Sequence, residues 1–99
     1  MRARRVDANH AQIVAAARKC GMSVLDLSGV GKGCPDLCFG YSGRSILVEV
    51  KDGAKSPSKR KLTPDQVAWR QTWTGGVLLV ESLDDVIKAK YHLMRGDKG

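Results

Sequence analysis

The chain has 99 residues, of which 42% are hydrophobic, and it carries a formal net charge of +7 at pH 7. This length suits one small domain around one core, and no stretch is apolar over the length of a membrane span. The excess of cations favours a polyanionic partner. Polar residues, rather than an apolar segment, follow the basic N-terminus, so we expect no signal peptide and a cytoplasmic protein.

The first predicted element is a helix that Asn9 caps, that runs to about Lys19 and that Gly21 ends. Its apolar stripe consists of Ile13, Val14, Ala17 and Cys20. Residues 23–27 follow as the first strand. Residues 28–34 are rich in glycine but lack the Gly-Lys-Ser/Thr of a P-loop, so we expect them to turn the chain tightly.

The next two predicted strands, residues 36–41 and 46–51, flank a tight turn at Ser42-Gly43 and form a hairpin. A two-residue or four-residue loop gives the same register, in which Asp36 lies opposite Glu49. Two carboxylates that face each other across strands repel unless a cation lies between them. The hairpin therefore predicts a metal site at one of its ends.

Side chains alternate along a strand, so Glu49 and Lys51 are predicted to leave the second hairpin strand side by side. Residues 63–66 then open a second helix, which Gly75-Gly76 closes, and residues 77–80 read as a fully buried strand. Ser82 begins the last helix, which ends near Arg95. The order αβββαβα predicts an α/β fold, more fully a mixed α+β fold, with a central mixed sheet flanked by helices.

Pro35-Asp36 followed by Glu49-x-Lys51 resembles the PD-(D/E)xK signature of restriction-endonuclease-like folds. The fuller pattern adds the glycine-rich lead of residues 31–37 and the segment 62–66, and it resembles the virus-type replication-repair nuclease (VRR-NUC) family. The similarity runs from about Val6 to the strand near Val80. It implies that residues 1–99 are a single VRR-NUC domain with a restriction-endonuclease-like core, from a bacterium or a phage.

The resemblance also implies roles for individual residues. Asp36, Glu49 and the backbone carbonyl of Val50 are the implied ligands of Mg²⁺ or Mn²⁺, which prefer oxygen donors. Lys51 is the implied stabiliser of charge that develops on the phosphate. Asp7 is a further candidate ligand, with a surface acid near a helix start as the other interpretation.

Gln66 has two interpretations of equal weight. By resemblance it is an active-site glutamine, and by its position it completes a capping box with Thr63. Trp69 and Trp73 lie four residues apart on one helix face. Packing in the core or in a dimer is favoured for this pair over stacking on DNA bases.

Cations concentrate at the N-terminus and in residues 51–61. A solvated surface is the general interpretation of such runs, but the second run leaves the strand that carries the implied catalytic pair, so phosphate contact is favoured. The predicted DNA-binding residues are Arg4, Arg5, Lys32, Lys55, Lys59, Arg60 and Lys61. A zinc site built from Cys20, Cys34, Cys38, His10 and His92 is disfavoured, because the spacing is poor for it.

The implied activity is hydrolysis of DNA phosphodiesters to leave a 5′-phosphate and a 3′-hydroxyl, on junctions, flaps or nicked duplex in replication or repair. The implied homodimer would place two sites on opposite strands, which suits a four-way junction. A helicase or replisome component is a further partner that could supply specificity. The alternatives are a non-catalytic DNA-binding accessory protein on the same fold and a sequence-specific restriction enzyme, for which the chain has no obvious recognition domain.

Overall fold

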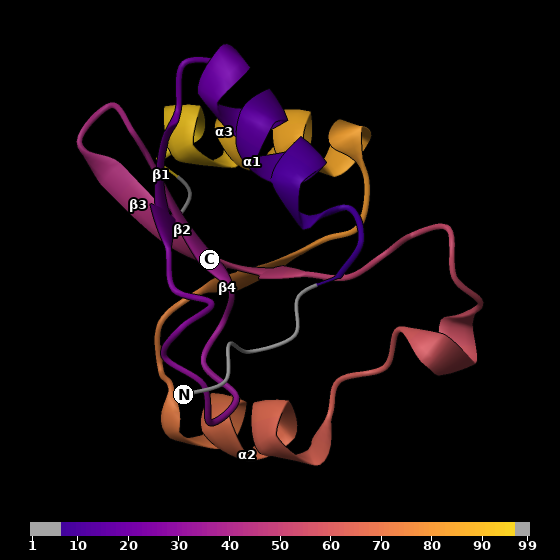
Figure 1. Cartoon of the computed structure of the whole chain (residues 1–99). Helices are drawn as coiled ribbons and strands as arrows, with labels where there is room; N and C mark the ends of the chain where they lie inside the picture. Colours follow the sequence, from indigo (N-terminus) through magenta and orange to yellow (C-terminus); the bar gives the residue numbers. More distant parts are fainter. Residues whose placement is uncertain (1–6, 97–99) are drawn as a thin grey trace.

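The computed structural model describes residues 7–96 (Figure 1). Its elements, in chain order, are α1 (His10–Lys19), β1 (Ser23–Asp26), β2 (Leu37–Tyr41), β3 (Arg44–Val50), the short 3₁₀ helix η1 (Pro57–Lys59), α2 (Pro64–Thr72), β4 (Val77–Val80) and α3 (Leu83–Arg95). Apart from η1, this is the predicted order αβββαβα. The prediction of a mixed α/β fold with a central mixed sheet is confirmed.

The four strands are arranged in the order β1-β2-β3-β4. β1, β2 and β3 are antiparallel neighbours, and β4 runs parallel to β3. Ser42 and Gly43 both have positive φ, 54° and 78°, which gives the hairpin turn the twist that joins adjacent strands. Leu37 lies opposite Val48, so the predicted register is confirmed.

One face of the sheet carries the hydrophobic core. Its strands contribute Leu37, Phe39, Val48, Val50 and Val80, while Ile13 and Ala17 come from α1, and Val86, Ala89 and Leu93 from α3. α1 and α3 contact each other and cover this face together, at the top of Figure 1. Core formation therefore uses the apolar face that strand alternation predicts.

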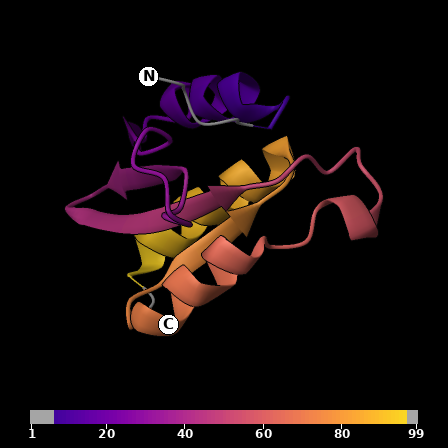
Figure 2. The same cartoon turned by 60° about the horizontal axis from the view of Figure 1, so that its bottom comes forward.

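α2 lies apart from the other two helices, at the bottom of Figure 1. Figure 2 shows the strands between α1 above and α2 below. The opposite face of the sheet is thus the one that α2 approaches. This face carries Glu49, which lies one residue from the core-facing Val48 and Val50.

Two local predictions are wrong. β4 is not fully buried: Leu79 is 45% exposed, because its side chain points to the face opposite the core and β4 is an edge strand. Asn9 occupies the N-cap position of α1 but its side chain makes no capping bond. Its amide Nδ2 instead donates to the backbone carbonyl of Lys51, at 3.1 Å, and thereby ties α1 to the end of β3.

Within residues 7–96, no helix has both the length and the apolar character needed to cross a membrane.

Candidate active site

Four polar side chains that the sequence singles out meet at the end of β3. Asp36 immediately precedes β2, and the hairpin register continued by one pair places it opposite Glu49. Lys51 directly follows β3 and lies on the same side as Glu49. Gln66, in the first turn of α2, completes the group. The exposed fractions are 5% for Asp36, 1% for Glu49, 8% for Lys51 and 5% for Gln66.

Gln66 links the acid and the lysine of β3. The Lys51 ammonium donates to Gln66 Oε1 at 2.8 Å, and Gln66 Nε2 donates to Glu49 Oε2 at 2.9 Å. Asp36 is held in part by the backbone, because its Oδ2 accepts a bond of 2.9 Å from the N–H of Val50. This bond is made by the N–H of Val50, and the implied role of the Val50 carbonyl as a metal ligand stays a prediction. Burial and hydrogen bonding together hold all four side chains in defined positions.

The capping interpretation of Gln66 is confirmed, and its active-site role stays a prediction. The backbone N–H of Thr63 donates to Gln66 Oε1 at 2.9 Å, and the backbone N–H of Gln66 donates to the Thr63 hydroxyl at 3.2 Å. This reciprocal pair is the predicted capping box. The same Oε1 accepts from Lys51, so a single side chain both starts α2 and contacts the lysine.

The glycine-rich loop closes over the start of α2. Gly31, Lys32 and Gly33 have φ values of 75°, 56° and 83°, all in the left-handed region. A side chain at Gly33 would collide with the backbone of Asp65. Only glycine permits this close approach, whereas Lys32 holds a conformation that is strained for a residue with a side chain. Strain of this kind beside a buried polar group is typical of a functional site.

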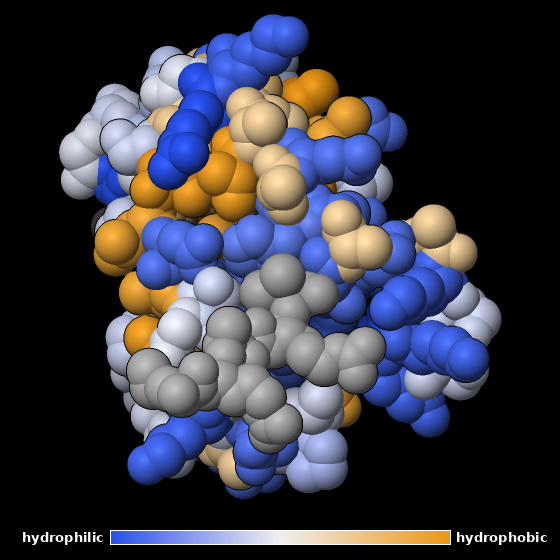
Figure 3. All heavy atoms as spheres, viewed as in Figure 1, coloured by the Kyte–Doolittle hydropathy of each residue, from blue (hydrophilic) through white to orange (hydrophobic). Residues whose placement is uncertain are grey.

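A cleft of about 600 Å³ opens over these four residues. Its rim includes Lys32, Lys55, Lys59 and Lys61, and the cleft also reaches Asp7 and Asp65. Figure 3 shows a predominantly hydrophilic surface at the right, where residues 51–61 extend from the sheet. The floor therefore contains two acids and one lysine, and the rim contains lysines from the glycine-rich loop and from residues 51–61.

Arg60, which is also predicted to bind DNA, does not line this cleft. Arg60 lines another hollow, and its guanidinium binds Glu81 at 2.8 Å and the backbone carbonyl of Lys55 at 2.7 Å. Its charge is therefore used to hold the loop against the end of β4. Arg4 and Arg5 lie outside the described residues.

The donor set can be tested against a hard divalent cation. Asp36 and Glu49 offer carboxylate oxygens in one cleft, and Mg²⁺ is commonly held by one or two carboxylates with water and substrate phosphate. When both acids are ionised, the buried group of Asp36, Glu49 and Lys51 has a net charge of −1, which also favours a cation. These residues fit Mg²⁺ or Mn²⁺ with few protein ligands.

The other candidate metal ligands in the described part of the chain do not add to the pair formed by Asp36 and Glu49. Within residues 7–96, no group of three or more His, Cys, Asp or Glu side chains is placed to hold a metal. Asp7 lines the cleft without completing such a group with the two acids. The described cysteines and histidines form no zinc site either, and Cys20, Cys34 and Cys38 are not joined in disulfides. His10 is half-buried, and its Nε2 lies 3.4 Å from Asp26 Oδ2.

The two tryptophans stack on each other, with ring centroids 5.1 Å apart. Neither belongs to the hydrophobic core of the described residues, and Trp73 is 45% exposed. The core-packing interpretation is therefore wrong for this pair.

Comparison of the chain with protein-family models, with curated proteins and with solved structures finds no match. The functional interpretation of the cleft consequently depends on its own residues and geometry.

Sequence reasoning missed one residue of the site's surroundings. Asn9 binds the carbonyl of Lys51 through its side chain, while the N–H of Lys51 donates to Val80 at 3.1 Å. Both backbone groups of Lys51 are thus held. An asparagine before a helix is usually a cap, so no local signal distinguishes this use.

Proposed function

We propose that this protein is a metal-dependent endonuclease of the VRR-NUC type, which hydrolyses DNA phosphodiesters to leave a 5′-phosphate and a 3′-hydroxyl. The observation that carries the proposal is the group of Asp36, Glu49, Lys51 and Gln66, each at most 8% exposed, on the floor of a cleft with a lysine rim. Burial of two acids opposite each other is costly for folding. A bound cation would explain the two acids on the floor of the cleft, and a bound phosphate would explain the lysines on its rim.

Each part of the cleft has a task in this proposal. Mg²⁺ or Mn²⁺ held by Asp36 and Glu49 would neutralise charge on the phosphate and make water easier to deprotonate. Lys51 offers an ammonium to the charge that develops during hydrolysis. Gln66 keeps Lys51 and Glu49 at a fixed separation, since it is bonded to both. The rim lysines bind backbone phosphates, which are independent of sequence.

The proposed substrate is branched DNA in replication or repair, and the proposed assembly is a homodimer with one site for each strand. An apolar stripe on α3 supports self-association. It consists of Leu83, Ile87, Tyr91 and Met94, each between 47% and 56% exposed, at helical spacings of four, four and three residues. Ile87→Glu is expected to convert a dimer to a monomer in light scattering, whereas a monomeric wild type would remove this part of the proposal.

Cleavage of a labelled four-way junction and of a matched linear duplex tests the activity. The reactions contain Mg²⁺, Mn²⁺ or EDTA and compare wild type, Lys51→Ala and a control, Lys88→Ala, whose side chain is 80% exposed on α3. We expect symmetric nicking of the junction that needs metal, disappears in Lys51→Ala and persists in Lys88→Ala. Equal cutting of both substrates would retain the nuclease and remove the structural specificity.

The second candidate function is a non-catalytic DNA-binding accessory protein on the same fold. Its support is the lysine rim, which suffices for phosphate binding without the acids. Binding of both substrates without cleavage in either metal would favour it. Cleavage that is unaffected by EDTA or by Lys51→Ala would show that the proposed site is not where the reaction occurs.

A further inference from the structure

Arg70 of α2 has an unusual environment for a cation. Its Nε and Nη2 atoms are buried and have no hydrogen-bond partner among the described residues. The guanidinium of arginine stays charged and offers five donors in a planar fork. Buried charges without partners are costly, and they are normally paired in folded proteins. An anion from outside the described residues would satisfy these donors.

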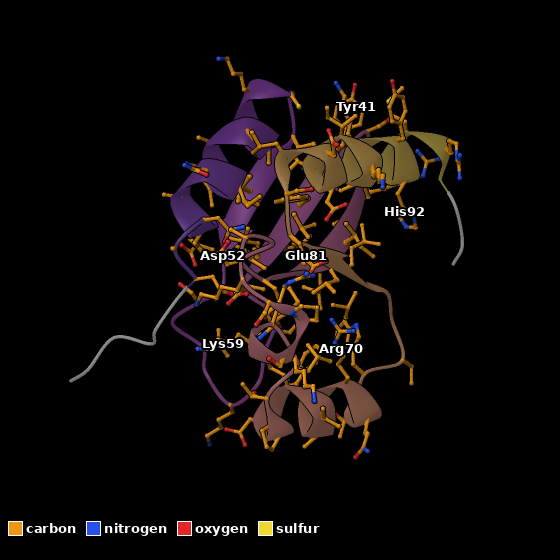
Figure 4. All side chains as sticks on the ribbon, turned by 90° about the vertical axis from the view of Figure 1, so that its right-hand side faces the viewer. Tyr41, Asp52, Lys59, Arg70, Glu81 and His92 are labelled. Carbon is orange, nitrogen blue, oxygen red and sulfur yellow. The ribbon has the colours of Figure 1, made fainter. Side chains whose placement is uncertain are left out.

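A hollow of about 220 Å³ adjoins this guanidinium, and Arg70, Trp73, Gly75 and Val77 line it. Its volume corresponds to roughly seven water molecules, which suits a phosphate group rather than a large ligand. Figure 4 shows Arg70 on the side of α2 that faces the sheet. The guanidinium and the half-exposed indole of Trp73 therefore form two walls of one small site.

The indole of Trp73 is held in place on two sides. Trp69 stacks on it with an interplanar angle of 25°. The backbone at Gly75 packs against its edge so closely that a Cβ there would lie 2.9 Å from Nε1. Trp73 nevertheless remains 45% exposed. A fixed and exposed indole is a platform on which a nucleic-acid base can stack.

Two offsets, one along α2 and one along the sheet, relate this hollow to the candidate active site. Gln66 and Arg70 are four residues apart on one face of α2, which corresponds to about 6 Å along the helix. In the sheet, Glu49 is paired with Leu79, and Val77 lies two residues before Leu79 on the same face, about 6.6 Å along the strand. Both offsets place the hollow close to the candidate active site, about one helical turn along α2 and two residues along β4.

We infer that Arg70 and Trp73 form a subsite for the nucleotide next to the scissile phosphate. The guanidinium binds the phosphate of that nucleotide, and Trp73 stacks on its base. A base in a duplex is already stacked between its neighbours, so this subsite selects an unpaired nucleotide beside the cut. The inference rests on the proposed nuclease function and, among the branched substrates proposed above, favours those with an unpaired nucleotide beside the cut.

The test measures binding of a fluorescein-labelled dT₁₂ oligonucleotide by anisotropy, in EDTA, so that cleavage does not contribute. Arg70→Gln removes the charge, and Lys88→Gln removes the same charge from an exposed site on α3. We expect Arg70→Gln to weaken binding by at least about tenfold and to reduce the slope of log Kobs against log salt by ~0.7. Lys88→Gln is expected to change neither quantity.

Tryptophan fluorescence reports on the indole of Trp73, the second wall of the hollow, because Trp69 and Trp73 are the two tryptophans of the chain. Quenching by dT₁₂ is expected in wild type and is expected to fall strongly in Trp73→Ala. A linear duplex is expected to quench less than dT₁₂. Equal quenching by dT₁₂ in wild type and Trp73→Ala would overturn the role of the indole.

Folding of the variants is checked by thermal denaturation. Arg70→Met removes two buried nitrogens that lack partners among the described residues and keeps an apolar stem, so it is expected to raise the Tm while weakening dT₁₂ binding. If Arg70→Gln and Arg70→Met both bind with the wild-type affinity and salt slope, the subsite does not exist.

These experiments distinguish a failure of this inference from a failure of the nuclease proposal. Binding that depends on Arg70 without any cleavage by wild type would retain Arg70 as a nucleotide-binding residue and reject the nuclease. Metal-dependent cleavage that is unaffected by Arg70→Gln, together with unchanged binding, would retain the nuclease and reject the subsite.

Discussion

The two faces of the central sheet bury different kinds of side chain. The face under α1 and α3 buries apolar residues such as Leu37 and Val48, which contribute to stability through the hydrophobic effect. The face toward α2 buries Glu49 and carries the partly exposed Leu79. Both faces are built from the same strands, and alternate residues serve one face or the other. The comparison indicates that one face stabilises the fold, while the other holds charges that folding alone does not require.

The largest expected difference is in unfolding free energy, when a leucine on each of the two faces is replaced by alanine. Leu37→Ala removes a fully buried side chain from the core and is expected to cost about 2–5 kcal/mol of unfolding free energy. Leu79→Ala alters a side chain that is 45% exposed, so we expect a loss below about 1 kcal/mol. Urea denaturation measures both. Equal losses would mean that the face toward α2 is also a core.

The next substitution is expected to lower activity strongly and to leave stability almost unchanged. Glu49→Gln keeps the size of the side chain and an oxygen that can accept from Gln66, but removes one of two opposed carboxylates. Cleavage is expected to fall by about 10²–10³-fold, while the Tm in EDTA stays the same or rises, because repulsion with Asp36 disappears. Thermal denaturation and the junction assay measure the two effects. A marked fall in Tm would assign the Glu49 carboxylate a structural role.

A smaller effect distinguishes the two uses of Gln66. Thr63→Ala removes the helix cap and is expected to cost about 1 kcal/mol of stability, with little change in cleavage. Gln66→Ala keeps the bond to the Thr63 hydroxyl but removes the bond from the Thr63 N–H and the bonds to Lys51 and Glu49, so we expect a further loss of cleavage of about tenfold. Denaturation and cleavage rates are measured on both variants. Identical cleavage by the two would restrict Gln66 to capping.

The smallest predicted effect depends on pH. The Ser28 hydroxyl and backbone N–H donate to Asp26 and lower its pKa below the ordinary value, and His10 adds to the effect. A carboxyl group whose pKa is lower in the folded state stabilises the protein above its unfolded pKa, and this contribution is lost as the pH falls through the folded pKa. Because Asp26 is 54% exposed, we expect at most about 0.5 kcal/mol.

The measurement is the difference in unfolding free energy between wild type and Asp26→Asn as a function of pH. That difference is expected to be present near pH 7 and to disappear on acidification below about pH 4. A difference that persists in acid would mean that the effect is not linked to the ionisation of Asp26.

The sequence by itself determined the features that depend on neighbouring residues. Strand alternation separates Glu49 from Val48 and Val50, and the turn at Ser42-Gly43 sets the register that brings Asp36 opposite Glu49. The capping box of Gln66 is equally local. Periods, turns and caps act over a few residues, so their outcome can be predicted without knowledge of how the elements pack.

Only the tertiary structure decided which distant groups meet. The Asn9 amide reaches the carbonyl of Lys51, Arg60 pairs with Glu81, and Arg70 lies beside a hollow with two unpaired nitrogens. Leu79 is exposed although its strand reads as apolar throughout. Each outcome depends on where a helix or loop packs against the sheet. Side-chain patterns specify which face of an element is apolar, but they do not specify which polar atom lies across from it in the folded chain.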